Sequence, residues 1–321
     1  YQSFIRASKA EQAGLTRQAV RDLDAAVALD SGFVSALHAR LDYAVASDEF
    51  AVADRLRAAL ARTDARATDF DRLRSQTYEA LYAGETEHSE AIAHKLVRRY
   101  PRDPRAYGVL NAVLETRGRF AEAESMWRTA LSLDSLTMEA GSGPCSPCSG
   151  FGVLARLQIQ QGKWADAERS ARRWVQLQPD APAAWATLTP VLAYQQRSDE
   201  ALDAVHHAIS LSGGDPATLD MLGRVLLSSR RYDTVDSLVT AWLAGRSPGL
   251  RTSALDLREL LLRERGQFRA ADSAVVPIWG EPHSSGAAPD LMHGSNLSWL
   301  RDYKGAEIVY ERASHPTGSP E

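Results

Sequence analysis

The chain has 321 residues, 44% of them hydrophobic and 24% charged, and its formal net charge is −4 at neutral pH. This balance disfavours nucleic acid as the main partner, because proteins that bind nucleic acid usually present a strongly basic surface. No apolar run approaches the roughly 18 residues that a membrane span requires, so no membrane span is expected. No signal peptide is visible either, but this says nothing about the compartment because the residues before Tyr1 are unknown.

The first third of the chain, residues 1–103, is expected to form degenerate helical repeats. Each repeat consists of two short amphipathic helices joined by a tight turn, which we call a hairpin. Gly14 and Gly84 stand where such turns are expected, and Pro101 ends the third hairpin. The three hairpins are expected at residues 1–30, 31–63 and 68–100.

Residues 104–136 carry the clearest hairpin. Pro104 suits the first turn of a helix, where its missing N–H is not needed. Gly118 follows a helix-length run, at a position where a left-handed residue is favoured. Neither helix exceeds about 15 residues, so neither is stable alone and each must bury its apolar stripe against its neighbours.

Residues 137–149, TMEAGSGPCSPCS, are rich in Gly, Ser and Pro and are expected to be a loop inserted between hairpins. Further hairpins are expected over residues 150–315, followed by a disordered tail at 316–321. Pro190 falls inside one expected helix and should kink it. Other helices are expected to open at Pro182, Pro216 and Pro248.

A small residue recurs near the start of each expected second helix, at intervals close to 34 residues. Such a period is typical of a helical repeat array. We therefore predict an all-α fold, a right-handed α-solenoid of about nine hairpins. The recurring residues are Ala19, Ala53, Ala91, Ala123, Ala167, Ala201, Val235, Ala271 and Ala306.

The 104–136 hairpin resembles the tetratricopeptide repeat family, in which aromatic, leucine and small residues recur over about 34 positions. Asn111 replaces the usual small residue and Ser135 the usual proline. The resemblance implies a noncatalytic scaffold that binds a protein or peptide in a concave groove. The residues that carry it are Tyr107, Leu110 and Leu114 on the first helix, and Ala123, Trp127 and Ala130 on the second.

The composition is also similar to that of repeat regions in bacterial multidomain regulators. This similarity implies a sensory or docking role, with an extracytoplasmic location as the first expectation and a cytoplasmic one as the alternative. Ile308 and Tyr310 would leave apolar surface uncovered near the C-terminal end. We therefore expect end-to-end docking, or an additional domain, at one or both ends of the array.

The inner face of the first helices is the candidate partner-binding groove. Arginine and aromatic side chains there would suit an extended peptide, an acidic peptide or a terminal carboxylate. The alternative is a face that is merely solvated. The residues expected on it are Arg156, Tyr194, Arg224, Arg263 and Trp299.

Cys145 and Cys148 form a CxxC pattern in the inserted loop. A structural disulfide, or a pair of inert thiols, is the first interpretation, and a shared metal or a redox pair are the alternatives. No second CxxC supports a zinc site. No cofactor, no metal site and no catalytic group is predicted, so we do not expect an enzyme. Another function left open is RNA binding, which a helical array could perform if its inner face were basic.

Overall fold

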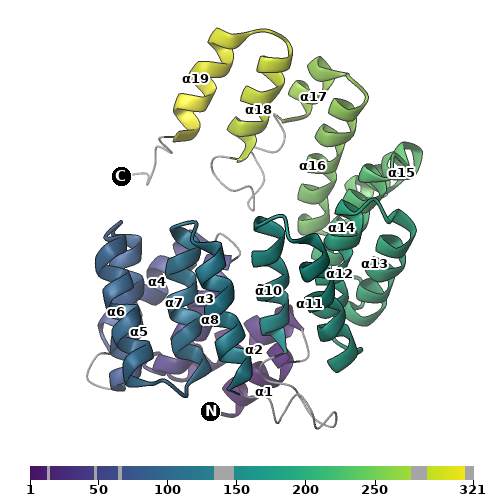
Figure 1. Cartoon of the computed structure of the whole chain (residues 1–321). Helices are drawn as coiled ribbons and strands as arrows, with labels where there is room; N and C mark the ends of the chain where they lie inside the picture. The colour runs from purple at the N-terminus through teal and green to yellow at the C-terminus, as the bar shows by residue number, and fades with distance from the viewer. Residues whose placement is uncertain (13–14, 47–48, 64–66, 134–147, 276–287, 315–321) are drawn as a thin grey trace. The chain divides into compact units, whose positions relative to one another are not determined.

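The computed structural model describes the chain except for residues 13–14, 47–48, 64–66, 134–147, 276–287 and 315–321 (Figure 1). It divides into two compact units, Tyr1–Gln195 and Gln196–Glu321. The boundary lies in the turn of one expected hairpin and not in the 137–149 insertion. The sequence did not predict this boundary.

The described residues form eighteen α-helices and no strand. This is the all-α fold that the sequence predicted, and the helix count is the one that nine hairpins require. Unit 1 contains α1 (Gln2–Gln12), α2 (Thr16–Leu29), α3 (Val34–Ala46), α4 (Phe50–Ala61), α5 (Asp69–Tyr82), α6 (Thr86–Arg99), α7 (Pro104–Thr116), α8 (Phe120–Ser132), α10 (Ser149–Gln160), α11 (Trp164–Leu177) and α12 (Pro182–Tyr194). Unit 2 contains α13 (Ser198–Ser212), α14 (Pro216–Ser228), α15 (Tyr232–Ala244), α16 (Pro248–Glu264), α17 (Phe268–Val275), α18 (Ala288–Trp299) and α19 (Tyr303–Ser314).

Within each unit the helices pack mainly on their neighbours in the chain, as expected of a solenoid. For example, α7 packs on α8 and α8 packs on the next described helix, α10. In unit 2, α15 likewise packs on α16, and α16 on α17. None of the described helices combines the length and apolar character needed to cross a lipid bilayer.

The helix starts follow local sequence signals. Prolines open α7, α12, α14 and α16, as predicted. Asp103 and Asp215 cap two of these helices, because their side chains accept hydrogen bonds from backbone N–H groups of the first turn. Pro190 lies inside α12, also as predicted.

In eight of the nine described second helices, the expected small residue is the fourth residue of the helix and is buried. The third hairpin is an exception to the sequence prediction. Ala91 is exposed, whereas Ser89 is fully buried and occupies the fourth position of α6. Its hydroxyl donates a 2.8 Å hydrogen bond to the carbonyl of Thr77 in α5. The assignment of Ala91 was wrong by two residues because a buried serine satisfies the same spatial requirement through a hydrogen bond.

The turns between paired helices require one residue with a left-handed backbone. Gly118 has φ +68°, and Gly84, Gly162 and Gly266 are similar. The equivalent residue between α14 and α15 is Arg230, with φ +56°. A non-glycine residue pays a steric cost in this conformation.

Charged side chains connect successive hairpins at an equivalent position, the fifth residue of the second helix. In α6 this residue is Glu90, which accepts from both Arg117 and Arg119 of the next turn. In α8 it is Glu124, which accepts from Lys163 at 2.9 Å. A carboxylate of one hairpin is therefore held by basic residues of the hairpin that follows.

The apolar core of unit 1 is not one continuous cluster. One cluster runs through the third, fourth and fifth hairpins, from Phe70 to Leu157. The second hairpin has a separate cluster that includes Leu37, Leu56 and Leu60. The junction between α4 and α5 therefore lies between two apolar clusters.

Candidate functional site

The first helices of neighbouring hairpins contact one another in both units, α10 with α12 in unit 1 and α14 with α16 in unit 2. Together they form a surface in each unit that we call the first-helix face. The five residues predicted for the groove all lie on first helices. Arg156 and Tyr194 belong to unit 1, and Arg224, Arg263 and Trp299 belong to unit 2.

Arg156 on α10 is half-exposed and already holds a carboxylate. Its two terminal nitrogens contact both oxygens of Glu115 on α7, one of them at 2.9 Å. The Asn111 amide donates to the same carboxylate. The fork geometry is the one by which arginine binds a carboxylate, and a carboxylate ligand at Arg156 would compete with Glu115.

Tyr194 and Trp299 are large aromatic residues that remain exposed, at 64% and 65%. Tyr194 ends α12, and its ring lies 5.0 Å from the ring of Trp164, the first residue of α11. Trp299 ends α18 and stacks in parallel on Phe268, the first residue of α17, at 5.2 Å. Each unit thus presents at least one supported aromatic ring at the C-terminal end of a first helix.

The two arginines of unit 2 also contact carboxylates of their own helices. The Nε of Arg224 donates to Asp220 at 2.7 Å. The Nη1 of Arg263 lies 3.5 Å from Glu259, whose buried carboxylate accepts a 2.9 Å hydrogen bond from the Asn296 amide. These carboxylates were not predicted, although both stand four residues before their arginine on the same helix, a spacing that the sequence shows.

Burial raises the pKa of two carboxyl groups on α16 of unit 2. Desolvation raises the pKa of Asp256 on α16 to about 6, against the lowering effect of nearby Arg224. Desolvation also raises the pKa of Glu259. The first-helix face of unit 2 therefore carries both positive and negative charges. The arginines offset only part of the negative charge of its carboxylates.

The predicted disulfide involves a residue outside the described part of the chain, Cys145. Cys148 immediately precedes α10 and is fully buried. It packs in an apolar cluster with Trp174, Ala181 and Ala184. The pairing of the two cysteines stays a prediction. Among the described residues, no group of three or more His, Cys, Asp or Glu side chains is arranged to hold a metal ion.

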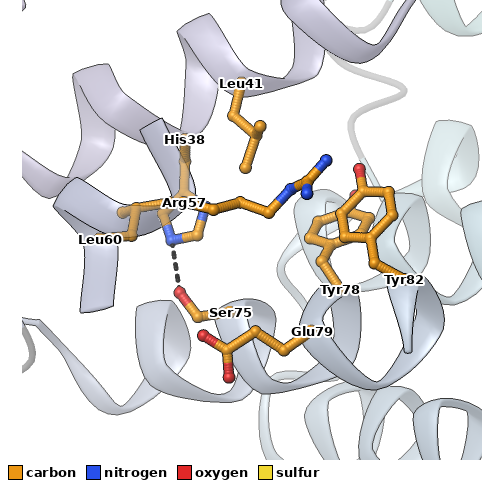
Figure 2. Close-up of a pocket in the computed structure, with 8 residues that line it drawn as sticks. All are labelled: His38, Leu41, Arg57, Leu60, Ser75, Tyr78, Glu79 and Tyr82. Carbon is orange, nitrogen blue, oxygen red and sulfur yellow. Dashed lines mark hydrogen bonds between the residues drawn. The ribbon is translucent and has the colours of Figure 1, made fainter. Parts of the chain in front are cut away.

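A polar pocket between α3, α4 and α5 was not predicted. Figure 2 shows the His38 ring above Ser75 and the Arg57 side chain extending toward two tyrosines. The Nε2 of His38 lies 3.2 Å from the Ser75 hydroxyl. The Arg57 guanidinium lies 4.2 Å from the centre of the Tyr82 ring. The walls of the pocket are His38, Leu41, Arg57, Leu60, Ser75, Tyr78, Glu79 and Tyr82.

The histidine in this pocket is neutral at physiological pH. Burial and, to a smaller extent, the nearby positive charge of Arg74 together lower the pKa of His38 to about 4. Arg74 itself is paired with Asp42 on α3. The junction between the second and third hairpins is thus made by polar contacts between α3 and α5.

Comparison with known proteins identifies the fold. No family model and no curated protein matches the sequence. A tetratricopeptide repeat protein from Parabacteroides merdae ATCC 43184 is similar in structure, with a TM-score of 0.56 and 14% identity over 78% of this chain and 94% of that one. Pseudomonas aeruginosa pilF aligns with a TM-score of 0.46 and 17% identity over 71% of this chain and 96% of the other. A MamA protein aligns with a TM-score of 0.40 and 13% identity, covering 63% of this chain and 94% of MamA.

The likeness to the Parabacteroides protein, together with the series of paired helices in the described residues, confirms the predicted all-α repeat fold. The chain is a helical repeat protein with the tetratricopeptide repeat fold.

Proposed function

We propose that the protein is a noncatalytic scaffold that binds a peptide segment of a protein partner on its first-helix face. The observation that supports this most directly is the exposed, supported aromatic ring of Tyr194, which lies on the first helix next to the one that carries Arg156. An aromatic platform and an arginine fork on neighbouring helices suit an extended segment that carries a carboxylate.

The corresponding residues of unit 2, Arg224, Arg263 and Trp299, are part of the proposal as a second contact region. The carboxylate of Asp220, whose side chain is 21% exposed, would favour a partner with a basic residue near its acidic ones. A role as the sensory or docking part of a larger bacterial regulator rests on the compositional resemblance alone.

The experiment that tests the site is photo-crosslinking from a defined position. A photoreactive phenylalanine analogue is placed at Tyr194, and in a second variant at Ala121, an exposed residue of the second helix α8. We expect the analogue at position 194 to form a discrete covalent adduct with the protein partner, and the analogue at position 121 to form none. Equal labelling from both positions would remove the first-helix face from consideration.

A matched substitution separates the arginine from the fold. Arg156→Gln should weaken the adduct at Tyr194, since the carboxylate-binding fork is lost. Glu115→Gln removes the competing internal carboxylate and should strengthen it. If both variants weaken the adduct equally, the Arg156–Glu115 pair acts only in folding.

We also propose that the outer face of α19 is a docking surface. Tyr310 is the eighth residue of α19 and is 39% exposed, whereas the eighth residue is buried in six other second helices. Ile308 beside it is 60% exposed. These residues would be covered if a second copy of the chain docked on this face of α19. Substituting Ile308→Glu and Tyr310→Glu should abolish concentration-dependent association in sedimentation velocity, and unchanged association would refute this surface.

A further inference from the structure

The junction between the second and third hairpins departs from the packing pattern that six other hairpins share. The eighth residue of a second helix is apolar and buried in α2, α6, α11, α13, α15 and α17. In α4 the same position is Arg57, whose side chain remains 32% exposed. On the facing helix α5, Ser75 stands where α7 has the buried residue Val109 and α16 has Leu257.

The Nε of Arg57 is buried at this junction without a hydrogen-bond partner among the described residues. The Nη1 of the same side chain is held at the surface by Asp54 at 2.8 Å. Arg57 lines the pocket of Figure 2 together with His38, a side chain that is 1% exposed. A buried polar atom without a partner is costly, so its retention at a site where other hairpins are apolar points to a ligand.

The space beside these side chains is divided into two parts that share Leu60, Ser75 and Glu79 as walls. The part next to His38 and Arg57 has a volume of about 10 Å³, enough for one water molecule or one polar atom. The adjoining cavity has a volume of about 330 Å³. Its apolar wall is formed by Val34, Leu60, Ala61 and Ala67. Its polar wall includes Arg72 and Gln76 from α5.

We propose that this junction binds a small organic acid, with one carboxylate oxygen beside the Nε of Arg57 and the hydrocarbon part against the apolar wall of the larger cavity. The guanidinium supplies the charge-assisted hydrogen bond that a carboxylate favours. The apolar wall favours an organic acid over an inorganic anion of the same charge. The tyrosines 78 and 82 are stacked 6.3 Å apart, and Tyr82 keeps the arginine in place through a cation–π contact.

The site is separate from the first-helix face proposed for a protein partner. Its residues come from α3, α4 and α5, whereas Arg156 and Tyr194 lie on α10 and α12. It gives the scaffold a means to recognise a metabolite. The bound acid would fill the cavity at this junction, and binding would therefore stabilise the contact between the second and third hairpins.

The test is thermal unfolding of the full chain with sodium acetate, propionate and benzoate, each compared with sodium chloride at equal ionic strength. We expect at least one of these acids to raise the midpoint by about 4 °C at saturation. Arg57→Leu should abolish this rise. Because leucine matches the apolar residues of the other hairpins, it should also raise the midpoint of the unliganded protein by about 2 °C.

Arg55→Leu is the matched control. Arg55 is an exposed residue of the same helix, and its substitution by leucine removes the same charge. It should leave the response to the acids unchanged. Arg57→Lys keeps the charge but lacks the Nε donor, so it should weaken the acid's affinity at least tenfold in calorimetric titration.

Several results would overturn the proposal. If no acid shifts the midpoint, the small cavity holds only water. If inorganic phosphate raises the midpoint as much as the organic acids do, the apolar wall plays no part. If Arg57→Leu lowers the midpoint of the unliganded protein, Arg57 is a structural residue and its position does not indicate a ligand.

Discussion

The Lys163 ammonium lies 2.9 Å from the Glu124 carboxylate, although the two residues belong to successive hairpins and are 39 positions apart. The amides of Gln158 and Gln161 each donate to the same carboxylate at 3.0 Å. Glu124 is only 5% exposed. One acidic side chain thus ties α8 to α10 and to the turn before α11.

Replacing this carboxylate should weaken the stack. We expect Glu124→Gln to lower the free energy of unfolding by about 2 kcal/mol, because Lys163 and the two glutamine amides lose a charged acceptor in a buried site. Urea unfolding measures the change. Glu122→Gln in the same helix is the control, since its carboxylate is 56% exposed and its loss should cost clearly less than the loss of Glu124. Equal losses in the two variants would contradict the burial argument.

The same carboxylate should make stability depend on pH in the acid range. Burial alone would raise the pKa of Glu124, but the hydrogen bonds from Gln158, Lys163, Arg128 and Gln161 outweigh it and lower the pKa to about 2. A carboxyl group with a folded pKa below its unfolded value stabilises the fold above pH 4.5 and loses this contribution as the pH falls toward 2. The contribution is on the order of 2–3 kcal/mol.

Thermal unfolding between pH 5 and pH 2.5 tests this linkage. The wild-type midpoint should fall more steeply than that of Glu124→Gln over this interval, because the variant has no proton to take up at this position. Parallel curves for the two proteins would show that Glu124 does not carry the effect.

Two helical glycines at equivalent positions should respond to alanine in opposite ways. A Cβ on Gly152 of α10 would lie 2.4 Å from the Trp174 ring, which is itself buried and held in the core. A Cβ on Gly108 of α7 would have its nearest contact at 3.9 Å. Gly152→Ala should therefore cost about 1–3 kcal/mol, whereas Gly108→Ala should stabilise α7 by about 0.5–1 kcal/mol. Denaturant midpoints of the two single variants give the comparison, and a shared sign would refute it.

The left-handed turn positions offer a second pair of opposed substitutions. Gly118 has φ +68° and Arg230 has φ +56°. Gly118→Ala should destabilise the turn by about 1 kcal/mol, since alanine does not readily adopt this conformation. Arg230→Gly removes the same cost from the turn between α14 and α15, and the relief is partly offset by the greater entropy of glycine when unfolded. We expect the free energy of unfolding, measured with urea, to rise by up to about 1 kcal/mol. A decrease would mean that the exposed Arg230 side chain stabilises the turn.

The helix positions could be predicted because local chemistry determines them. Pro182, Pro216 and Pro248 fix helix starts through their backbone geometry, and Gly118 fixes a turn for the same reason. The register of the third hairpin could not be predicted equally well. Ser89 and Ala91 are both small, and only the contact of Ser89 with Thr77 distinguishes them.

The candidate sites were harder to predict because they depend on contacts between hairpins. Arg156 could be placed on a first helix from the sequence, but its partner Glu115 lies 41 positions earlier. The polar junction between α4 and α5 does have a signal in the sequence. Aligning the second helices by their fourth residue places Arg57 in a column where Leu23, Ala93 and Ala171 are buried.

The charged side chain of Arg57 has a consequence for how order spreads along the chain. In a repeat array, two neighbouring repeats unfold together only if the interface between them is stable enough to couple their unfolding. An interface built from His38, Ser75 and Arg57 couples them less than an apolar one does, so the first two hairpins form a weakly linked end segment. Amide hydrogens in α1–α4 should accordingly exchange faster with deuterium than those in α7 and α10, and a common exchange rate across these helices would refute the weak link.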